Sequence, residues 1–325
     1  MLLLPDHWTW DFWIVKEDDL YHLFFLKAPK SLQNPDRRHE AARVGHAVGT
    51  DLRDWAVQPD ALGPGPEGAW DDLAIWTGSA LRAESRWYMF YTGINQRERG
   101  AHQRIGMAVS DDLATWVKHP VPVLTLDPLR YEGSTPEWNA IDWRDPWVYR
   151  SAEGSEYRML FTARAAGGAV DERGVIGLAR SYDLVNWCPE APMYAPGEYG
   201  HMEVPQLFEA DGHWYLSYSV YADQHSARRR QACRPETGTH YAIGPTESDP
   251  WRTLSSKFFS GDPAGELYAG RFERDPEGRL VFLAFLQFVG GGPFVGGLSD
   301  PYPVTIDSNG RLSIQRQRID VPEVR

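Results

Sequence analysis

Short runs of alternating or continuous apolar residues, separated by polar turns, recur along the whole chain and predict β-strands rather than helices. The clearest pair covers residues 74–82 and 87–92, which a polar turn at Glu84-Ser85 joins into a hairpin. Similar hairpins recur at intervals of 57 to 70 residues, and the apolar centres of their second strands are Leu23, Met89, Met159, Leu216 and Leu283. A supersecondary unit repeated at a nearly constant spacing predicts a repeat architecture.

Each hairpin is followed by a segment in which small and apolar residues alternate, and then by a Ser/Asp turn and a Trp. The copies are residues 45–55, 106–116, 177–187 and a degraded copy at 241–251. The alternation predicts a third strand, and the Trp is expected to open a fourth. Five units of four antiparallel strands predict an all-β fold: a five-bladed β-propeller that residues 1–325 form as a single domain, without a C-terminal β-sandwich. Residues 223–239 are predicted to be a long loop within the fourth blade.

Charge and composition narrow the range of partners. The net charge of −12 argues against nucleic acid and against an anionic membrane surface. No segment has the apolar length of a membrane span, and residues 1–4 are too short for the apolar region of a signal peptide, so the sequence predicts a cytoplasmic protein. Cys188 and Cys233 cannot form a disulfide framework and show no CxxC spacing. The 42 aromatic residues (14 Trp, 15 Tyr and 13 Phe) suit both packing between blades and carbohydrate binding.

Three carboxylates stand at nearly the same place in three of the repeats. Asp11, Asp145 and Glu203 precede the second-strand centres of their units by 12, 14 and 13 residues. The first strand of a propeller blade lines the central channel, so these side chains are expected to converge at one mouth of it. The corresponding places in the second and fifth units are Thr77 and the neighbourhood of Tyr268. Each acid lies among bulky apolar neighbours, and because burying a carboxylate is costly, a functional role is favoured over a turn or capping role.

Five short motifs occur in order along the chain, one in each predicted blade. They are Trp10-Asp11-Phe12-Trp13, Trp76-Thr77-Gly78-Ser79-Ala80, Arg144-Asp145-Pro146, Glu203-Val204-Pro205 and Tyr268-Ala269-Gly270-Arg271-Phe272. Together they resemble the landmarks of the fructan-active five-bladed propellers of glycoside hydrolase families 32 and 68. The first motif is closer to the Trp-Asp-Ser-Trp form of family 68 than to the Asn-Asp-Pro-Asn form usual in family 32. Residues 183–187, Asp-Leu-Val-Asn-Trp, also resemble family 43, whose members are mostly inverting arabinofuranosidases and xylosidases.

The resemblance implies roles for the three acids: Asp11 as nucleophile, Glu203 as acid/base and Asp145 as a stabiliser of the transition state. A furanoside is cleaved through an oxocarbenium-like transition state, which needs a proton donor at the leaving oxygen and a carboxylate at the anomeric carbon. With two carboxylates nearby, Glu203 is expected to have a raised pKa and to stay protonated near neutral pH. The resemblance thus implies a retaining β-fructofuranosidase that acts on sucrose or fructans, by hydrolysis or transfructosylation, without a metal or other cofactor.

Further residues are candidates for contacts with an oligosaccharide or small glycoside: Trp10, Trp76, Ser79, Arg144, Glu266 and Tyr268. His46 and His201 are interpreted as core or rim histidines, and Gln206 is expected to point away from the site. Two alternatives stay open at this point. One is an inverting arabinofuranosidase or xylosidase of the family 43 type, and the other is a non-catalytic sugar-binding propeller. The sequence does not fix the oligomeric state.

Overall fold

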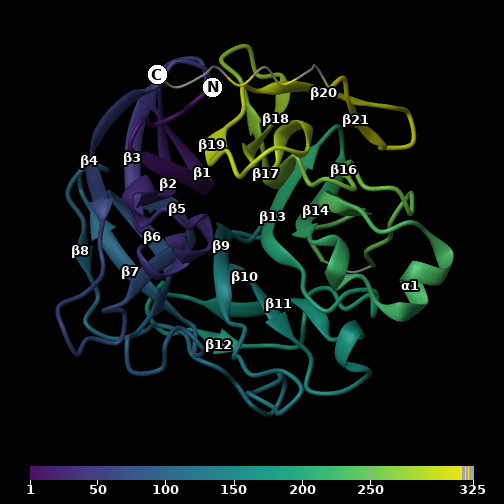
Figure 1. Cartoon of the computed structure of the whole chain (residues 1–325), viewed down its shortest axis with the longest axis horizontal. Coiled ribbons are helices and arrows are strands. Elements are labelled where there is room, and N and C mark those ends of the chain that lie inside the picture. Colours follow the sequence, from purple (N-terminus) through teal and green to yellow (C-terminus); the bar gives the residue numbers. More distant parts are fainter. Residues whose placement is uncertain (249, 317–318, 320, 322–325) are drawn as a thin grey trace.

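The computed structural model describes residues 1–248, 250–316, 319 and 321. Five antiparallel sheets stand like blades around a central axis, and the chain passes through them in order (Figure 1). Their first strands contact one another in a ring around that axis. The predicted five-bladed propeller with four antiparallel strands per blade is therefore confirmed.

The blades follow the predicted repeat. From the axis outward, the first blade contains β1 (His7–Glu17), β2 (Leu20–Pro29), β3 (Arg43–Gly49) and β4 (Ala56–Leu62). The second contains β5 (Ala74–Ala83), β6 (Arg86–Ile94), β7 (Arg104–Ser110) and β8 (Val117–Lys118). The third contains β9 (Arg144–Arg150), β10 (Tyr157–Arg164), β11 (Gly174–Ser181) and β12 (Cys188–Pro189).

The last two blades vary the pattern. The fourth contains β13 (Glu203–Ala210), β14 (His213–Val220), β15 (Thr237–Gly244) and β16 (Ser260–Asp262). The fifth contains β17 (Leu267–Arg274), β18 (Leu280–Leu286), β20 (Tyr302–Ile306) and β21 (Leu312–Ile314), and the short β19 (Gly297–Leu298) pairs with the end of β18. Leu2 exchanges two backbone hydrogen bonds with Leu298, so the start of the chain joins the first blade to the fifth.

The fourth blade departs from the prediction in two places. Trp251 does not open its outer strand; Ile243 instead exchanges backbone hydrogen bonds with Arg252, and the outer strand β16 forms farther along the chain. Residues 223–239 are not one loop, because they contain the helix α1 (Ala227–Ala232) and the start of β15. The hydroxyl of Ser226 caps α1 by accepting a hydrogen bond from the Arg229 N–H. The other helical segments in the described residues are short 3₁₀ helices of three to six residues: η1 (Lys30–Leu32), η2 (Pro35–Glu40), η3 (Val170–Glu172), η4 (Ala222–Gln224) and η5 (Val289–Gly291).

The repeated Asp-Leu-x-x-Trp segment is a structural turn. Asp183 accepts hydrogen bonds from the backbone N–H groups of the two residues that follow Leu184, and Leu184 adopts a positive φ of 66° with its side chain buried. The Trp187 indole donates to the Leu184 carbonyl and packs edge-on against Phe90 of the preceding blade. Trp116 repeats this arrangement against Phe24. The motif therefore seals one blade onto the next, which accounts for its presence without a link to family 43.

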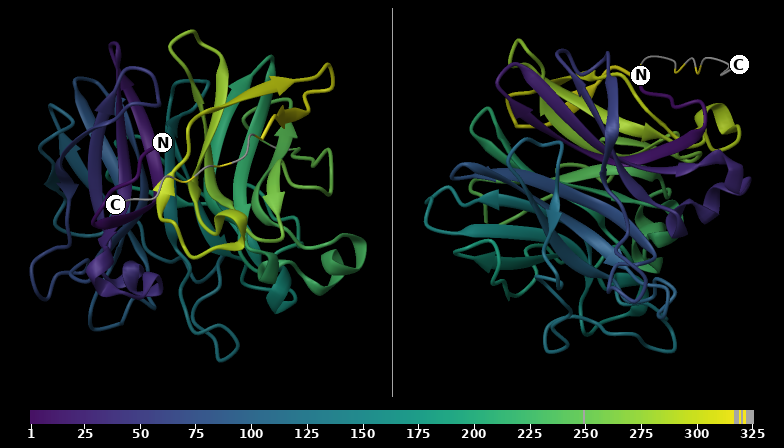
Figure 2. Two further views of the ribbon diagram at one scale, coloured as in Figure 1. Left: turned by 45° about the horizontal axis from the view of Figure 1, so that its top comes forward. Right: turned by 90° about the vertical axis from the view of Figure 1, so that its left-hand side faces the viewer.

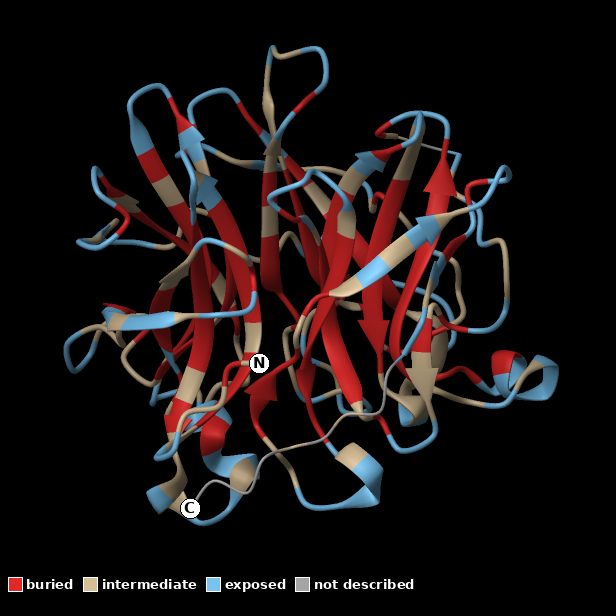
Figure 3. Cartoon of the chain, turned by 90° about the horizontal axis from the view of Figure 1, so that it is seen from above, coloured by how far each residue is buried: buried red, intermediate tan, exposed pale blue. Residues whose placement is uncertain are grey.

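Burial follows the same geometry. The buried residues lie along the strands and between the blades, whereas the connections at the two ends of the propeller are mostly exposed (Figure 3). Figure 2 shows the same sheets from two further directions. No helix in the described ranges is long and apolar enough to cross a membrane.

Candidate active site

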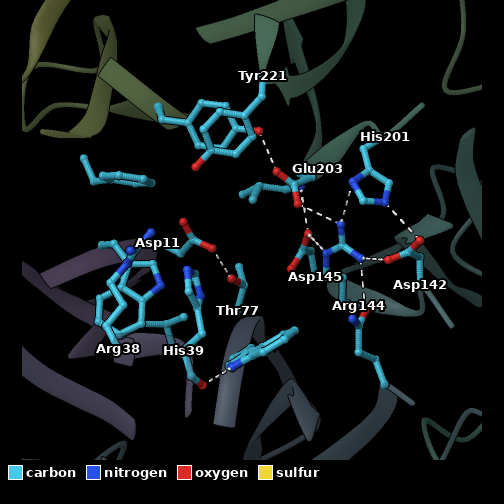
Figure 4. A pocket seen from close by; sticks show the side chains of 17 residues that line it. Asp11, Arg38, His39, Thr77, Asp142, Arg144, Asp145, His201, Glu203 and Tyr221 are labelled. Carbon is cyan, nitrogen blue, oxygen red and sulfur yellow. Dashed lines mark hydrogen bonds and ion pairs between the residues drawn. The ribbon is translucent and has the colours of Figure 1, made fainter. Parts of the chain in front are cut away.

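A cavity of about 350 Å³ opens at one mouth of the central channel (Figure 4). Its walls combine carboxylates, arginines, histidines and aromatic rings. The lining residues are Trp10, Asp11, Leu26, Arg38, His39, Trp76, Thr77, Gln103, Asp142, Arg144, Asp145, His201, Glu203, Val204, Tyr221, Tyr268 and Phe285. The three predicted acids are therefore brought together, from β1, β9 and β13, as the repeat had indicated.

All five innermost strands are irregular at the same level. In each of them the register of pairing with the second strand shifts over two or three residues. The shifts lie between Trp10 and Phe12 in β1, Trp76 and Gly78 in β5, Arg144 and Trp147 in β9, Glu203 and Gln206 in β13, and Tyr268 and Arg271 in β17. A β-bulge inserts an extra residue, breaks the strict alternation of side chains and re-aims one of them. The bulges in β9, β13 and β17 place Asp145, Val204 and Ala269 at positive φ angles of 59°, 54° and 48°. At this level every blade contributes a polar side chain to the cavity wall: Asp11, Thr77, Asp145, Glu203 and Tyr268.

The Asp11 carboxylate faces the cavity with few compensating contacts. Its Oδ2 accepts a hydrogen bond from the Thr77 hydroxyl. Removal from water, together with repulsion from Asp145 and Glu203, raises its pKa to about 7, although the Thr77 hydrogen bond and the positive charge of Arg38 oppose this shift. Asp11 therefore exchanges its proton near neutral pH.

Arg144 is buried and connects the other acids of the site. Its guanidinium donates to Asp142 and, over 2.7 Å, to Oε1 of Glu203, and its Nε lies 3.7 Å from Oδ2 of Asp145. His201 lies 2.9 Å from Asp142 through its Nε2. One guanidinium therefore partly balances three carboxylates, two of which were predicted from the sequence.

Glu203 is held in its charged form. Burial raises its pKa, but Arg144, His201 and the Tyr268 hydroxyl, which donates to Oε2 over 2.5 Å, outweigh burial and hold the pKa below its ordinary value. The prediction of a raised pKa for Glu203 is therefore wrong for this pocket, because the sequence showed the neighbouring acids but not the ion pair with Arg144.

Asp145 is fixed more by hydrogen bonds than by its ion pair. Its Oδ2 accepts from the Thr162 hydroxyl over 2.8 Å and from the Val204 N–H over 3.1 Å. Burial raises the pKa of Asp145 against the effect of Arg144. The carboxylate is thus held rigidly in the wall between the third and fourth blades.

Four of the six predicted sugar-contacting residues line the cavity: Trp10, Trp76, Arg144 and Tyr268. Ser79 does not, and this prediction is wrong. It lies two residues after Thr77, but the bulge resets the alternation there, and the buried Ser79 hydroxyl accepts a hydrogen bond from the Val148 N–H over 3.0 Å. The prediction that Glu266 contacts the sugar is also wrong. Glu266 does not line the cavity, and its Oε1 accepts a hydrogen bond from the Gly290 N–H over 2.9 Å.

Replacing Ser79 by Ala is expected to destabilise the fold without altering substrate affinity. The variant leaves the buried Val148 N–H without an acceptor, which costs about 1–3 kcal/mol of unfolding free energy. Denaturant unfolding and KM measured on the same preparation check this. A raised KM with an unchanged free energy of unfolding would contradict this prediction and show that Ser79 contributes to substrate binding.

Several lining residues were not predicted: Arg38, His39, Gln103, Asp142 and Tyr221. Arg38 and His39 lie on η2, in the connection between β2 and β3, where no repeat position marks them. Asp142 carried a weak signal, because it stands two residues before Arg144 in the same segment. His201 lines the cavity as well, so its interpretation as a core or rim histidine is corrected. His46 does pack in the core, against Phe24 and His22, and Gln206 points away from the site and bonds the Phe272 backbone.

Within the described ranges, no group of three or more His, Cys, Asp or Glu side chains is arranged to hold a metal ion. The arrangement that is present can donate and accept protons and can place a carboxylate against an electrophilic carbon.

Comparison with known proteins gives a consistent result. The model of the glycosyl hydrolases family 32 N-terminal domain matches residues 13–291, a range that contains Asp145 and Glu203 and begins two residues after Asp11. Sucrose-6-phosphate hydrolase of Bacillus subtilis (strain 168) is 27% identical over 277 residues, which cover 82% of this chain and 52% of that protein. Levanase of Bacillus sp. (strain L7) is 26% identical over 334 residues, covering 91% of this chain and 30% of the levanase. The chain thus spans about half the length, or less, of these curated relatives.

Solved structures share the fold at lower identity. The inulosucrase from Halalkalicoccus jeotgali bound to kestose superposes with a TM-score of 0.79 at 21% identity, covering 98% of this chain and 92% of that one. The levansucrase from Gluconacetobacter diazotrophicus superposes with a TM-score of 0.78 at 16% identity, covering 97% and 82%.

Proposed function

We propose, from the premise that this chain belongs to glycosyl hydrolase family 32, that it is a retaining β-fructofuranosidase. The observation that carries the proposal is the convergence of Asp11, Asp145 and Glu203, from three different blades, on one cavity at the channel mouth. Neither packing nor the repeat requires three acids at this level.

The relatives support a substrate that contains a fructosyl unit. The names of the first three refer to sucrose 6-phosphate, to levan and, for the fructan 6-exohydrolase of Beta vulgaris, to fructan. One of these substrates carries a phosphate and the others are neutral. The fructosyl unit that they share is the class proposed for this chain.

In the proposed mechanism, Asp11 attacks the anomeric carbon of the fructosyl unit while Glu203 protonates the departing oxygen. Glu203 then removes a proton from the water or acceptor sugar that releases the fructosyl unit from Asp11. Asp145, held by Thr162 and the Val204 N–H, accepts hydrogen bonds from the sugar hydroxyls and favours the positive charge that develops on the ring. Trp10 and Trp76 wall the sugar.

The reactive form carries one proton on the Asp11–Glu203 pair. This proton favours Asp11, because burial raises the pKa of Asp11 to about 7 whereas Arg144 holds that of Glu203 below its ordinary value. Catalysis needs the opposite arrangement, with the proton on Glu203. Both arrangements contain one proton, so they are populated in a fixed ratio across the pH range in which the pair holds one.

We therefore expect kcat/KM to be highest on the acid side of neutrality. Above about pH 7 the pair loses its only proton and no acid remains, and at low pH a second proton neutralises the nucleophile. Thr77→Val removes the hydrogen bond that lowers the pKa of Asp11, so the alkaline limb of the profile should move to higher pH. A pH series of kcat/KM for both proteins checks this, and an unmoved alkaline limb would contradict it.

The inverting alternative loses its sequence support, because residues 183–187 form the same structural turn as 112–116. A retaining enzyme places its two carboxyl groups about 5–5.5 Å apart and an inverting one about 6.5–9.5 Å, and we propose the shorter separation for Asp11 and Glu203. A non-catalytic sugar-binding propeller would have no need of three convergent acids.

Incubation with sucrose, inulin, levan and a nitrophenyl arabinofuranoside tests the proposal. Release of fructose, with the first-formed anomer of unchanged configuration by NMR, is the expected result. Turnover of only the arabinofuranoside with inversion would favour the family 43 chemistry. Binding of a sugar without turnover of any substrate would favour the lectin-like alternative.

A further inference from the structure

One buried arginine contacts all three blades that carry a predicted acid. Arg271 of β17 is only 1% exposed and does not line the cavity, so it lies behind the cavity wall, out of reach of a bound sugar. It can therefore influence the reaction only through the residues that it contacts.

The guanidinium of Arg271 joins the segments that carry the proposed nucleophile and the proposed acid. Its Nε donates to the Phe12 carbonyl over 3.3 Å, and Phe12 directly follows Asp11 in β1. Its Nη1 donates to the Pro205 carbonyl over 2.6 Å, and Pro205 lies two residues after Glu203 in β13. Hydrogen bonds from one side chain thus connect the first and fourth blades through the fifth.

A third contact of Arg271 reaches the third blade. The central carbon of the guanidinium lies 4.9 Å from the centre of the Trp147 ring, and Trp147 stands two residues after Asp145 in β9. A guanidinium above an aromatic face is held by a cation–π attraction, which also fixes the plane of its donors. Each of the three acids therefore has a residue one or two positions further along its strand that contacts Arg271.

The bulge of β13 explains why donors are needed behind the wall. Val204 and Pro205 lie inside this bulge and pair with no residue of β14, so their carbonyls need hydrogen-bond donors from elsewhere. The Nη1 of Arg271 serves both, since it also donates to the Val204 carbonyl over 3.4 Å. A guanidinium carries five N–H donors in one plane and can bind carbonyls on two sides at once, whereas a lysine ammonium is a single compact group.

Stability alone would not favour this arrangement. In the described part of the chain the Arg271 guanidinium forms no ion pair, and its buried Nη2 has no hydrogen-bond partner. Burial lowers the pKa of Arg271 to about 10, while Asp145, Asp11 and Glu273 favour its charged form, so it is a cation at neutral pH. Burying an unpaired charge and an unsatisfied donor costs free energy, which indicates a role beyond packing.

We infer that Arg271 is a positioning residue, which sets the separation of the Asp11 and Glu203 carboxyl groups by holding the bulges of β1 and β13 together across the fifth blade. This inference rests on the proposed function and deepens it. The two acids come from blades that are not adjacent, since β17 contacts both β1 and β13 in the ring. A displacement of about 1 Å between reacting groups can slow a reaction by about 10²-fold, so a fixed distance across this gap matters to turnover.

The test compares Arg271→Met and Arg271→Lys with the wild-type protein on sucrose, inulin and levan. Arg271→Met keeps an unbranched side chain but removes the charge and every donor. Arg271→Lys keeps the charge and one donor group, so it can bind the Phe12 or the Pro205 carbonyl but does not reproduce the planar fork that binds both.

Arg229→Lys is the matched control. Arg229 is also buried, packs 4.8 Å from the centre of the Tyr199 ring and donates to the Ser256 carbonyl over 2.7 Å, but it does not line the cavity or contact a residue next to an acid of the site. Thermal melting identifies an assay temperature at which all four proteins are folded.

Arg271→Met is expected to lower kcat by about 10²-fold with a much smaller change in KM, because the side chains that wall the sugar remain while the reacting groups are displaced. Arg271→Lys should fall between Arg271→Met and the wild-type protein. Arg229→Lys should leave kcat unchanged, even where its melting temperature is lower. If Arg271→Met does not fold, a reduced kcat in Arg271→Lys with little change in KM carries the test.

Crystal structures of the wild-type protein and of the folded Arg271 variant measure the same effect without turnover. The distance between the Asp11 and Glu203 carboxyl groups is expected to change by about 0.5–1 Å. An unchanged distance, an unchanged kcat, or equal losses of kcat in the Arg271 and Arg229 variants would overturn the inference and leave the proposed function standing. Absence of wild-type turnover on every fructoside would instead reject the proposed function, while the two structures would still decide whether Arg271 sets the distance.

Discussion

Asp11→Asn should lower kcat on sucrose or a fructan by on the order of 10⁴-fold or more, the scale on which loss of a covalent nucleophile reduces turnover. The amide keeps the volume of the carboxylate and can still accept the Thr77 hydrogen bond, but it cannot attack the anomeric carbon. Steady-state kinetics on the purified variant measures the loss. Asp36→Asn, which changes an exposed carboxylate on η2, is the control and should leave kcat unchanged.

The same variant should be no less stable than the wild-type protein, and more stable at alkaline pH. The pKa of Asp11 is raised in the folded protein, to about 7, above the value expected for an unfolded chain. Ionising Asp11 therefore weakens the folded state progressively as the pH rises from about 4 through about 7. Melting temperatures of the two proteins should diverge at pH 8, with Asp11→Asn higher, and converge near pH 4. A variant that loses activity because it melts earlier at every pH would contradict the assignment of Asp11 as the nucleophile.

Glu203→Gln should separate substrates by their leaving groups. General acid catalysis contributes about 10²- to 10⁴-fold, and this contribution is needed when the leaving oxygen belongs to a sugar. An activated aryl fructoside departs without protonation, so its kcat/KM should fall far less than that of sucrose. The Gln side chain can still accept the Arg144 hydrogen bond, which keeps the wall of the cavity in place.

The control for Glu203→Gln is the same substitution at Glu277, an exposed residue in the turn between β17 and β18. It should alter neither substrate. Equal losses on sucrose and on the aryl fructoside in Glu203→Gln would show that Glu203 does not act as the acid, and would leave it a role in holding Arg144.

The repeat made most of the fold and the position of the acids predictable. The spacing of the apolar centres Leu23, Met89, Met159, Leu216 and Leu283 marks the second strand of every blade, and counting back from them reaches the bulged level of the inner strands. The fourth blade was the least predictable, because after Trp251 the chain runs to β16 without a regular pattern.

The sequence alone could not predict which side chains contact one another across neighbouring blades. Ser79 stands two residues from a cavity residue, and only the bulge at Thr77 shows that its hydroxyl bonds the Val148 N–H instead. Glu203 was expected to gain a proton from crowding by other acids, whereas Arg144 stabilises its negative charge. Arg38 lies in a connection that has no counterpart in the repeat. In each case the deciding contact joins segments that are distant along the chain.

The two blades that contribute no acid at the bulged level each contribute a hydroxyl to an acid of the neighbouring blade. Thr77 of the second blade donates to Asp11 of the first, and Tyr268 of the fifth donates to Glu203 of the fourth. Asp11 and Glu203, which are proposed to react with the sugar, therefore also form hydrogen bonds that link adjacent sheets. A small rotation of one blade against the next would stretch these bonds before it exposed any core. Catalytic turnover should therefore fall when adjacent blades are slightly misaligned, even where the strand content of the protein is unchanged.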